Sequence, residues 1–566
     1  MHGKLFQLLI ITLLLIHVKP AVAQVAAPVP FNEAAVVTAD DHATQAGIEI
    51  LEMGGNAVDA AIAVQFALAV TLPRAGNIGG GGFAMIRLAN GEIHSLDFRE
   101  KAPSGATRTM FLDEDGEYNP DLSRRGALAS GVPGTVDGMI SALERYGTLP
   151  LEVIMEPAIR LANSGFRLTH SHAQSLNRNR ENFEAFETSR KRFTRPDGTD
   201  WHEGHRFIQT ELGETLQRIA RQGRDGFYSG LTARMIIREQ RRHGGIMTLR
   251  DLRNYESEWR TPLTATFNDH QIHMMPPPSS GGVVMQQVLD MIKHPLNEDM
   301  GANSSGYIHL LTEAFRRSFA DRNYYLGDPD FEQMPLDTLI SKPYLDRRFS
   351  DFNPEHATSS DEIRRGSITG HTESDETTHF SVVDGSGNAV AVTTTLNGSY
   401  GNFMTVEGAG FLLNNEMDDF SAKPGEPNMF GLIGAEANAI EPGKRMLSSM
   451  SPTIVTQSGE LRMIAGGSGG PTIISATLQN ILNVIHFRMD AAQAILMPRF
   501  HHQWLPDRIV YEQHTLPDDV KHALEEKGHE LHDISTLART HILVIDEEGV
   551  RTGAADPRGH GSVRGF

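Results

Sequence analysis

Two runs of β-prone residues place the strongest constraint on the fold of this 566-residue chain. They are Glu376–Asp384 and Ala389–Asn397, and the four residues between them include Gly385 and Gly387. β-Branched and aromatic residues on both sides of a short glycine turn are typical of an antiparallel hairpin. The sequence therefore predicts a two-stranded element here.

The length of the turn decides which residues face each other across this hairpin. A three-residue loop pairs Asp384 with Asn388, and Thr377 then lies opposite Thr395. A two-residue loop places Thr378 opposite Thr395 instead. Either register brings two hydroxyl groups together at the open end. The first register also separates an apolar face from a polar one, namely Phe380, Val382, Val390 and Val392 from Thr377, His379 and Ser381. Threonine-rich strands are common in purely structural roles, so the hairpin alone leaves its function open.

The composition argues against several kinds of site and partner. The chain has no cysteine, so it can form neither a disulfide nor a thiolate metal site. A formal net charge of −20 argues against nucleic acid or an anionic membrane as the main partner. No H-E-x-x-H spacing is present, and His501-His502 has no further ligands nearby in the sequence. We therefore expect no metal.

The N-terminus has the pattern of a secretory signal peptide. The apolar run Leu5–Val18 follows Lys4 and precedes the small residues Ala21-Val22-Ala23. This run is too short to span a membrane, and a cleavage signature follows it. We expect cleavage near Ala23, no membrane anchor, and a periplasmic or secreted protein.

Two helices are expected next, Asp40–Met53 and Ala57–Leu72. The second is small and apolar on all sides, which is typical of a helix buried in a large domain. The glycine run Gly79–Gly82 leads into a strand with no Lys-Ser/Thr after it, which favours close backbone packing over phosphate binding. Residues 129–325 are expected to be mostly helical.

A second predicted hairpin ends at Arg99. Its strands, Phe83–Ala89 and Glu92–Phe98, flank Asn90-Gly91, which is a strong signal for a tight turn. An arginine at a strand end is usually a solvated charge. Its guanidinium is also well suited to bind a carboxylate through two parallel hydrogen bonds, so both roles stay open here.

Two later stretches carry further hypotheses. Residues 354–376 are polar and of low complexity, which is typical of a linker or of a segment where the chain is cut. The glycine cluster Gly466–Gly470 precedes a helix expected from Thr472 to His486. Backbone N–H groups at such a helix start can hold an anion or an oxyanion.

Seven motifs, in this order, resemble the γ-glutamyltranspeptidase (glutathione hydrolase) family over nearly the whole mature chain. They are Ala75–Gly82, Asp97–Glu100, Gly131–Thr135, Thr377–Asp384, Asn415–Ser421, Leu447–Thr453 and Gly469-Gly470. The resemblance implies an α/β fold of the N-terminal-nucleophile hydrolase class, a four-layer α-β-β-α sandwich, with no cofactor.

The resemblance also implies that the precursor cuts itself between Glu376 and Thr377. After loss of the signal peptide (1–23), a large subunit (24–376) and a small subunit (377–566) would stay together as a heterodimer. As the first residue of the small subunit, Thr377 would carry both a nucleophilic hydroxyl and an α-amine. The ordinary pKa of that amine, about 7.7–8.0, suits a general base.

The remaining roles are carried over from the family by position. Arg99 would bind the α-carboxylate of a γ-glutamyl group, with Ser448 and Ser449 as further donors. Asn397, Glu416 and Asp419 would hold the substrate, the two acids taking its α-ammonium. Thr395 would hydrogen-bond the nucleophile, and Gly469 and Gly470 would form the oxyanion hole. The implied substrates are glutathione and other γ-glutamyl compounds, with water, an amino acid or a dipeptide as acceptor.

The loop Pro424–Ala435 matches a lid found in some bacterial members of the family. It carries Phe430 where those members usually have tyrosine, so the hydroxyl that would bond Asn397 is missing, and we expect a looser lid. Two other interpretations remain: a cephalosporin or glutaryl acylase on the same scaffold, which Glu416 and Asp419 disfavour, and an uncleaved periplasmic binding or structural protein.

Overall fold

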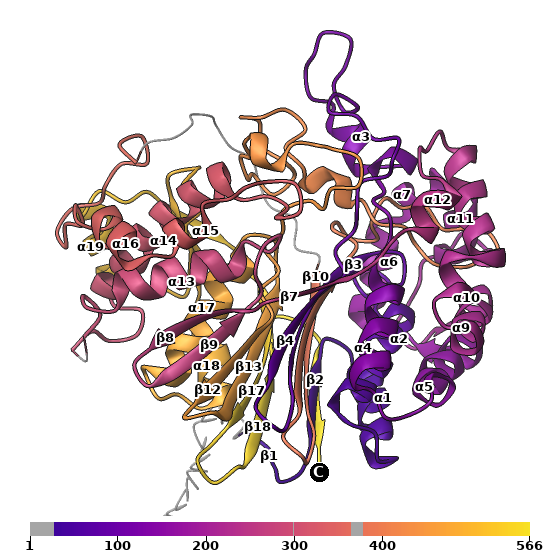
Figure 1. Ribbon diagram of the computed structural model, residues 1–566, viewed down its shortest axis with the longest axis horizontal. Coiled ribbons are helices and arrows are strands. Elements are labelled where there is room, and N and C mark those ends of the chain that lie inside the picture. The colour runs from indigo at the N-terminus through magenta and orange to yellow at the C-terminus, as the bar shows by residue number, and fades with distance from the viewer. Residues whose placement is uncertain (1–27, 298, 364–376) are drawn as a thin grey trace, which may run out of the picture.

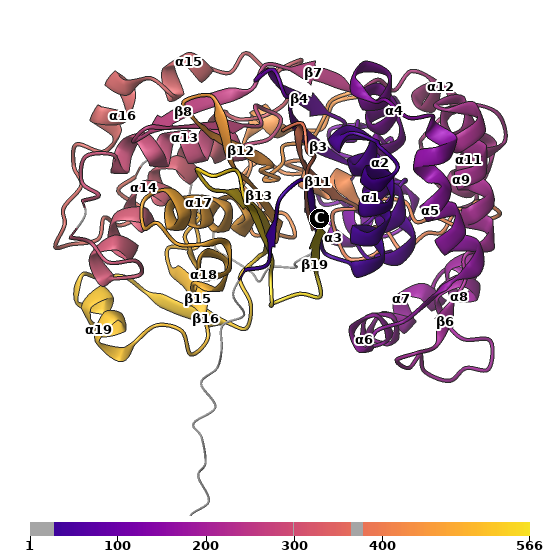
Figure 2. The same cartoon turned by 90° about the horizontal axis from the view of Figure 1, so that it is seen from below.

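The computed structural model describes residues 28–297, 299–363 and 377–566. Two seven-stranded sheets face each other, and helices cover both outer faces (Figure 1, Figure 2). This arrangement confirms the predicted four-layer α-β-β-α sandwich. The signal peptide and the bond between Glu376 and Thr377 lie outside the described residues.

Both large sheets are antiparallel throughout their paired strands. Sheet A has the order β1 (Pro30–Phe31), β18 (Arg551–Ala555), β17 (Arg539–Ile545), β13 (Glu460–Ser468), β12 (Thr453–Gln457), β9 (His270–Met274) and β8 (Leu263–Phe267). Sheet B has the order β19 (Ser562–Gly565), β2 (Ala35–Thr38), β10 (Thr377–Val383), β11 (Ala389–Thr395), β3 (Gly81–Arg87), β4 (Ile93–Asp97) and β7 (Glu258–Arg260). Two small sheets comprise β14 (Phe500–His501), β15 (Ile509–Glu512) and β16 (Leu531–Ile534), and β5 (Phe166–Arg167) with β6 (Arg206–Phe207).

The helices form two groups, one on each side of the sheets (Figure 1). On the side of sheet B lie α1 (Asp41–Glu52), α2 (Ala57–Thr71), α4 (Thr135–Tyr146), α5 (Leu151–Ser164), α6 (His170–Arg178), α7 (Arg180–Glu184), α8 (Glu187–Phe193), α9 (Thr210–Gln222), α10 (Asp225–Tyr228), α11 (Gly230–Arg242) and α12 (Leu249–Arg253). On the side of sheet A lie α13 (Gly281–Ile292), α14 (Ser305–Tyr325), α15 (Leu336–Leu339), α16 (Lys342–Arg348), α17 (Thr472–Ile485), α18 (Ala491–Leu496) and α19 (Asp518–Glu526). The remaining helices of the described residues are the short α3 (Pro120–Arg124), η1 (Ala127–Ala129), η2 (Glu416–Asp419) and η3 (Glu436–Asn438).

Three apolar layers hold this sandwich together. The layer between the two sheets contains Val37, Phe83, Met85, Ala391, Ile454, Ile464 and Leu543. The opposite face of sheet B packs on α2 and its neighbours through Ala84, Ile86, Phe380, Val382, Val390 and Val392. The outer face of sheet A packs on α13, α14 and α17 in the same way. Alternate residues of β10 and β11 therefore enter different cores, as the period of a strand requires.

The hairpin of β10 and β11 has the first of the two registers expected from the sequence. Thr377 pairs with Thr395, and the Asp384 N–H donates to the Asn388 carbonyl oxygen at 3.0 Å. The Asp384 carboxylate accepts hydrogen bonds from the backbone of Ser386 and Asn388, and Gly387 adopts a positive φ of 88°. The turn residues thus select the three-residue loop.

The predicted N-terminal helices and glycine run are confirmed. α2 is buried along its whole length, and Asn56 caps its start. A Cβ at Gly80 would overlap the carbonyl oxygen of Thr395, and one at Gly79 would overlap that of Leu412. The glycines therefore allow this loop to pack directly against the end of β11.

Residues 129–325 are mostly helical, as expected, but they also include the short strands β5, β6, β7, β8 and β9. The last three of these strands are held by pairing: β9 pairs with β8 and β12, and β7 pairs with β4. The sequence indicated a linker or a cut segment over residues 354–376, and its described part, 354–363, is packed against the rest of the protein: the Ala357 N–H donates to the Lys527 carbonyl oxygen, and the Ser360 hydroxyl donates to the Trp504 carbonyl oxygen.

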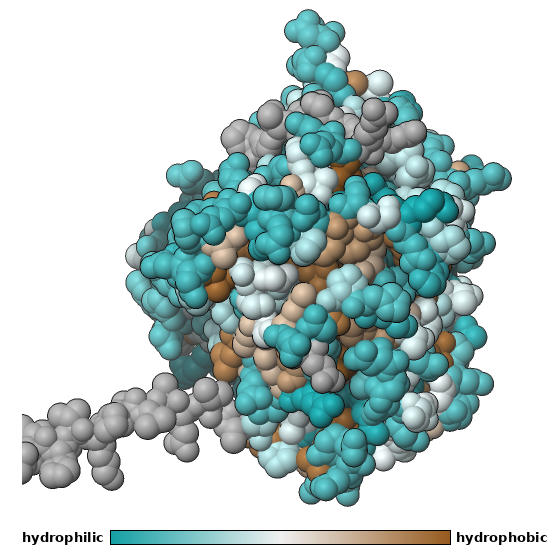
Figure 3. Space-filling view, turned by 90° about the vertical axis from the view of Figure 1, so that its left-hand side faces the viewer, coloured by the Kyte–Doolittle hydropathy of each residue, from teal (hydrophilic) through white to brown (hydrophobic). Residues whose placement is uncertain are grey.

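The surface on the side of α16 and α19 is mostly hydrophilic, with apolar residues in its middle (Figure 3). Within the described ranges, no helix has the length and apolar character needed to cross a membrane.

Replacing Gly80 by alanine tests the close packing beside β11. The added methyl would collide with the Thr395 carbonyl oxygen, so we expect a loss of about 1–3 kcal/mol of unfolding free energy. Denaturant unfolding measures it. Gly306→Ala is the control, because the space around this glycine near the start of α14 is open; that variant should be at least as stable as the wild type. Equal stability of the two variants would contradict the packing argument.

Candidate active site

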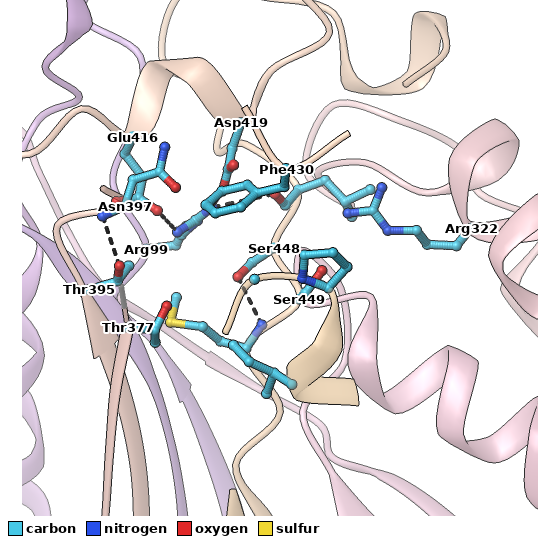
Figure 4. A pocket seen from close by; sticks show the side chains of 15 residues that line it. Arg99, Arg322, Thr377, Thr395, Asn397, Glu416, Asp419, Phe430, Ser448 and Ser449 are labelled. Atoms are coloured by element: carbon cyan, nitrogen blue, oxygen red, sulfur yellow. Dashed lines mark hydrogen bonds and ion pairs between the residues drawn. The ribbon is translucent and has the colours of Figure 1, made fainter. Parts of the chain in front are cut away.

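One pocket at an end of the sandwich collects the residues expected at the site (Figure 4). It is lined by Arg99, Thr377, Thr395, Asn397, Glu416, Asp419, Ser448, Ser449 and Gly470, together with Arg322, Phe430, Leu447, Met450, Pro471 and Ile473. Gly469 lies one residue outside this lining, and Glu376 is outside the described residues. Segments more than 300 positions apart in the sequence therefore meet at one place.

The two threonines stand side by side at the open end of the hairpin (Figure 4). The Asn397 N–H donates to the Thr395 hydroxyl at 2.7 Å. Asn397 itself has a φ of 72°, and its side-chain amide donates to the Asn415 carbonyl oxygen at 3.0 Å. The chain therefore turns sharply after β11 and carries Asn397 into the pocket.

A buried asparagine fixes the end of β11 from the other side. The Asn77 side-chain amide donates to the Thr395 carbonyl oxygen at 2.9 Å and to the Thr394 hydroxyl at 3.0 Å. Its oxygen accepts from the Gly80 N–H and from the Thr135 hydroxyl. The loop before β3 is thus tied to the strand that carries Thr395.

Arg99 enters the pocket from the end of β4 with its side chain fully buried. Its backbone N–H donates to Asp97, and its carbonyl oxygen accepts the Tyr255 hydroxyl at 2.8 Å. The guanidinium pairs with Glu416 and Asp419 and also donates to the backbone oxygens of the 446–447 segment. Burial alone would lower the pKa of Arg99, but the facing carboxylates raise it overall, so this side chain stays charged.

Burial also decides the behaviour of the acids in the pocket. Burial raises the pKa of Asp419 to about 6 and that of Glu416 well above its usual range, although the Arg99 guanidinium opposes both shifts. Glu100, next to Arg99, is fully buried, and its pKa rises to about 7. One arginine thus faces three acids whose ionised forms are destabilised by desolvation.

The serine pair and the glycine pair provide hydrogen-bond donors on other walls of the pocket. Ser448 is fixed by Ser280, whose N–H and hydroxyl both donate to its carbonyl oxygen at 2.7 Å. The Ser449 hydroxyl is buried and has no partner among the described residues. Gly469 and Gly470 have φ values of 133° and 54° just before α17, and neither N–H has an acceptor within the described part of the chain. These donors are available to a bound group.

The lid segment covers this pocket through Phe430 (Figure 4). The ring lies so close to Gly470 that a Cβ there would collide with it. Asn397 reaches the neighbouring Met429 thioether at 3.5 Å, and Asn428 donates to Asp419 at 3.3 Å. The space left inside is about 20 Å³, roughly the volume needed for one water molecule.

Two further features emerge only in the structure, one in this pocket and one outside its lining. Arg322 reaches the pocket from α14, is almost fully buried, and has no carboxylate within 4 Å in the described ranges. His309, Glu313 and His529 bring possible ligand atoms within 4.8 Å of one another. However, Glu313 is already paired with two arginines, Arg316 and Arg317, which disfavours a cation there.

Comparison with known proteins gives the family. The family model described as Gamma-glutamyltranspeptidase matches residues 43–566. The chain belongs to the γ-glutamyltranspeptidase family. A glutathione hydrolase proenzyme of Escherichia coli (strain K12) is 43% identical over 532 residues, or 94% of this chain and 91% of that protein. One from Pseudomonas aeruginosa (strain PAO1) is 42% identical over 532 residues, covering 93% of each.

Solved structures of similar proteins support the same fold. Helicobacter pylori gamma-glutamyltranspeptidase is 44% identical with a TM-score of 0.57, and the match covers 58% of this chain and 94% of that one. A cephalosporin acylase from Bacillus halodurans is 26% identical with a TM-score of 0.85, covering 95% and 97%. This member of an enzyme family has the N-terminal-nucleophile hydrolase fold.

The Arg99→Met variant tests the electrostatic balance of the pocket. It leaves buried carboxyls without their guanidinium, so we expect the free energy of unfolding to fall by about 3–5 kcal/mol at pH 8. The loss should shrink at pH 5.5. The folded-state pKa values of Glu100 and Asp419 are raised to about 7 and about 6, so these acids protonate as the pH falls and their penalty disappears. Unfolding midpoints at both pH values measure this.

Arg160→Met is the matched control, since Arg160 is about half exposed and pairs with Glu49 and Glu156 at the surface. Its effect should stay below about 1 kcal/mol at either pH. If Arg99→Met lost the same unfolding free energy at both pH values, the raised pKa values of Glu100 and Asp419 would be contradicted.

Proposed function

We propose that this protein is a self-cleaving γ-glutamyltransferase and glutathione hydrolase. The observation that carries the proposal is the opposed charges in one pocket with Thr377: a buried guanidinium, Arg99, faces two acids, Glu416 and Asp419. The α-carbon of a γ-glutamyl group carries a carboxylate and an ammonium, so it needs a cation and anions close together. The names of the relatives, glutathione hydrolase proenzyme, support the same substrate and a processed form.

In this proposal the precursor cuts itself between Glu376 and Thr377, giving subunits of residues 24–376 and 377–566. The fold supports continued association of the two chains. β10 pairs with β2 and β11 pairs with β3, so strands of the small subunit lie between strands of the large subunit within sheet B. Separation would break these ladders and expose both adjacent cores. The heterodimer is therefore the expected mature form.

The chemistry proposed for Thr377 uses its own two functional groups. The α-amine created by cleavage accepts the hydroxyl proton, and Oγ attacks the γ-carbonyl carbon of the donor. The N–H groups of Gly469 and Gly470 stabilise the oxyanion that forms. The amine of the leaving group takes the proton, and a γ-glutamyl ester remains on Thr377. Water or an acceptor amine then attacks this ester and regenerates the hydroxyl.

Substrate binding in this proposal replaces existing ion pairs. The substrate α-carboxylate binds to the Arg99 guanidinium and accepts further hydrogen bonds from Ser448 and Ser449. The α-ammonium then pairs with Glu416 and Asp419. Asn397 supplies a further polar contact, and Thr395 orients the nucleophile. Because the closed pocket has a volume of about 20 Å³, the lid segment that carries Phe430 must move to admit the substrate. Without a tyrosine hydroxyl, Asn397 contacts the lid through the Met429 thioether, and the lid is also held by Asn428 on Asp419 and by the Met429 N–H on Asp418.

A glutaryl or cephalosporin acylase is the second candidate, because an acylase from Bacillus halodurans shares the fold and the Acylase ACY 1 proenzyme of a Pseudomonas strain is 34% identical. A glutaryl group has no α-ammonium. The two buried acids would then face an apolar methylene, which is unfavourable. The two acids therefore favour the γ-glutamyl donor.

We also propose export to the periplasm or medium, on the signal-peptide pattern of residues 1–23.

A denaturing gel of the purified protein tests self-cleavage. The wild type should give two bands of about 40 and 20 kDa, from 62.2 kDa over 566 residues. Thr377→Ala should stay a single chain, since it lacks the attacking hydroxyl. Thr378→Ala is the control: its side chain is buried and its hydroxyl has no partner among the described residues, so cleavage should persist. A split Thr377→Ala chain would refute the proposed nucleophile.

Release of p-nitroaniline from γ-glutamyl-p-nitroanilide, with and without glycylglycine, tests the activity. We expect release without the dipeptide, from hydrolysis, and faster release with it, from transfer. Glutaryl-p-nitroanilide is the matched substrate without the α-ammonium. Preference for the glutaryl compound would favour the acylase instead.

A further inference from the structure

Arg322 is a buried cation of the pocket to which the proposed reaction gives no role. It lies in the last turn of α14, is 4% exposed, and lines the same pocket as Thr377 and Arg99. Figure 4 shows its side chain reaching from α14 toward the side of the pocket where Asp419 and Phe430 lie. A charged group in such a place needs partners, because burial removes it from water.

The other buried arginines of the described residues have such partners. Five of them pair with at least one carboxylate within 4 Å, namely Arg99, Arg316, Arg317, Arg445 and Arg499. Another, Arg87, donates from Nη1 and Nη2 to the carbonyl oxygens of Gly387 and Gly459 at 2.8 and 2.9 Å. Within the same ranges, Arg322 has neither a carboxylate within 4 Å nor a backbone oxygen as acceptor. Its charge is therefore left without a close anion.

The hydrogen bonds that Arg322 does make leave much of its guanidinium unused. Nε donates to the Ser280 hydroxyl at 3.3 Å, and Nη1 donates to the Asn323 side-chain oxygen at 3.0 Å. A guanidinium has five N–H groups, so one on Nη1 and both on Nη2 have no acceptor among the described residues. The buried Ser449 hydroxyl has no partner there either. The pocket thus holds several donors for which the described protein supplies no acceptor.

The Ser280 hydroxyl connects Arg322 to the serine pair of the pocket. It accepts from Arg322 Nε and donates to the Ser448 carbonyl oxygen at 2.7 Å, and the Ser280 N–H donates to the same oxygen. The guanidinium and the two serines, Ser448 and Ser449, border one space of about 20 Å³. An anion in this space would meet both the free N–H groups and the serine donors.

The charges that line the pocket indicate which anion is expected. Two guanidiniums, Arg99 and Arg322, stand with two acids, Glu416 and Asp419. Arg99 already pairs with both acids. Burial lowers the pKa of Arg322 only to about 10, so this side chain is charged at neutral pH. An entering carboxylate would therefore find its uncompensated cation at Arg322.

We propose that Arg322 is a second guanidinium for the α-carboxylate of the donor, which is bound between Arg99 on one side and Arg322 with Ser449 on the other. A carboxylate has about four lone-pair sites on its two oxygens, so it can accept from both arginines and the serine together. Arg322 is then a specificity-determining residue for donors with a free α-carboxylate. The inference rests on the proposed function, since it takes the γ-glutamyl group to enter this pocket.

The test compares two donors that differ only in this group. They are γ-glutamyl-p-nitroanilide and its α-carboxamide, in which an uncharged amide replaces the α-carboxylate. The value of kcat/KM is taken from the slope at low donor concentration, so weakly bound donors can be measured too. The variants are Arg322→Met, Arg322→Lys and, as the matched control, Arg87→Met. Arg87 is also buried without a carboxylate partner, but it lies outside the pocket lining.

We expect Arg322→Met to lower kcat/KM about 10- to 100-fold for the carboxylate donor and by less than about threefold for the carboxamide, because only the first loses a hydrogen bond to a charged group. Arg322→Lys keeps the charge without the planar set of N–H groups, so it should recover part of the loss. Arg87→Met should leave the ratio of the two donors unchanged.

Equal losses for both donors would overturn the inference, because Arg322 would then act through the fold or through Asp419. An unchanged kcat/KM for the carboxylate donor would overturn it too. So would an effect confined to the KM of glycylglycine, since the arginine would then bind the acceptor. A denaturing gel shows whether each variant has been cut. If Arg322→Met is not cut, Arg322→Lys makes the same comparison, with a smaller loss confined to the carboxylate donor.

The proposed function can fail separately. If the wild type releases p-nitroaniline from neither donor, the γ-glutamyl site itself is wrong, and the inference falls with it. If the wild type cleaves the γ-glutamyl donor but the Arg322 variants affect both donors alike, the inference alone is wrong.

Discussion

The pairing of β10 with its neighbours is the constraint on which the site depends. β10 lies between β2 and β11 in the middle of sheet B, so its register is set on both sides. A slip by one residue would turn Phe380 and Val382 out of their core and carry Thr377 to the opposite face. Asp384 prevents this slip by fixing the turn and by accepting the Ala57 N–H at the start of α2. The position of the Thr377 hydroxyl thus follows from the sheet.

The second determinant is the balance of buried charge around Arg99. A guanidinium in a dry pocket is tolerable only with acids facing it, and these acids are tolerable only with the guanidinium. In the empty site Arg99 pairs with Glu416 and Asp419. A zwitterionic substrate brings one charge of each sign, so it can enter without changing this balance. A glutaryl group, which brings a carboxylate without an ammonium, would change it, which is why the acid set argues for a γ-glutamyl donor.

The parts of this structure that the sequence predicts are those governed by local rules. The turn at Gly385–Asn388 limited the hairpin to two registers, and the glycine run Gly79–Gly82 at the start of β3 indicated close backbone packing. The place of β9 in its sheet could not be predicted from local sequence, because it depends on pairing with β12, which lies about 180 residues later. Arg322 was missed as part of the site for a related reason: only the tertiary structure brings it to the pocket. The roles of Arg99 and Asp419 came from family resemblance, and the structure adds that they meet.

The central claim is that Thr377 is both the first residue of the small subunit and the residue that carries the γ-glutamyl group. The most direct test is mass spectrometry of the enzyme quenched during turnover of γ-glutamyl-p-nitroanilide, with peptide mapping of the smaller chain. The account predicts a chain that begins at Thr377 and a γ-glutamyl ester on that residue. A smaller chain with a different first residue, or an adduct on another side chain, would contradict it.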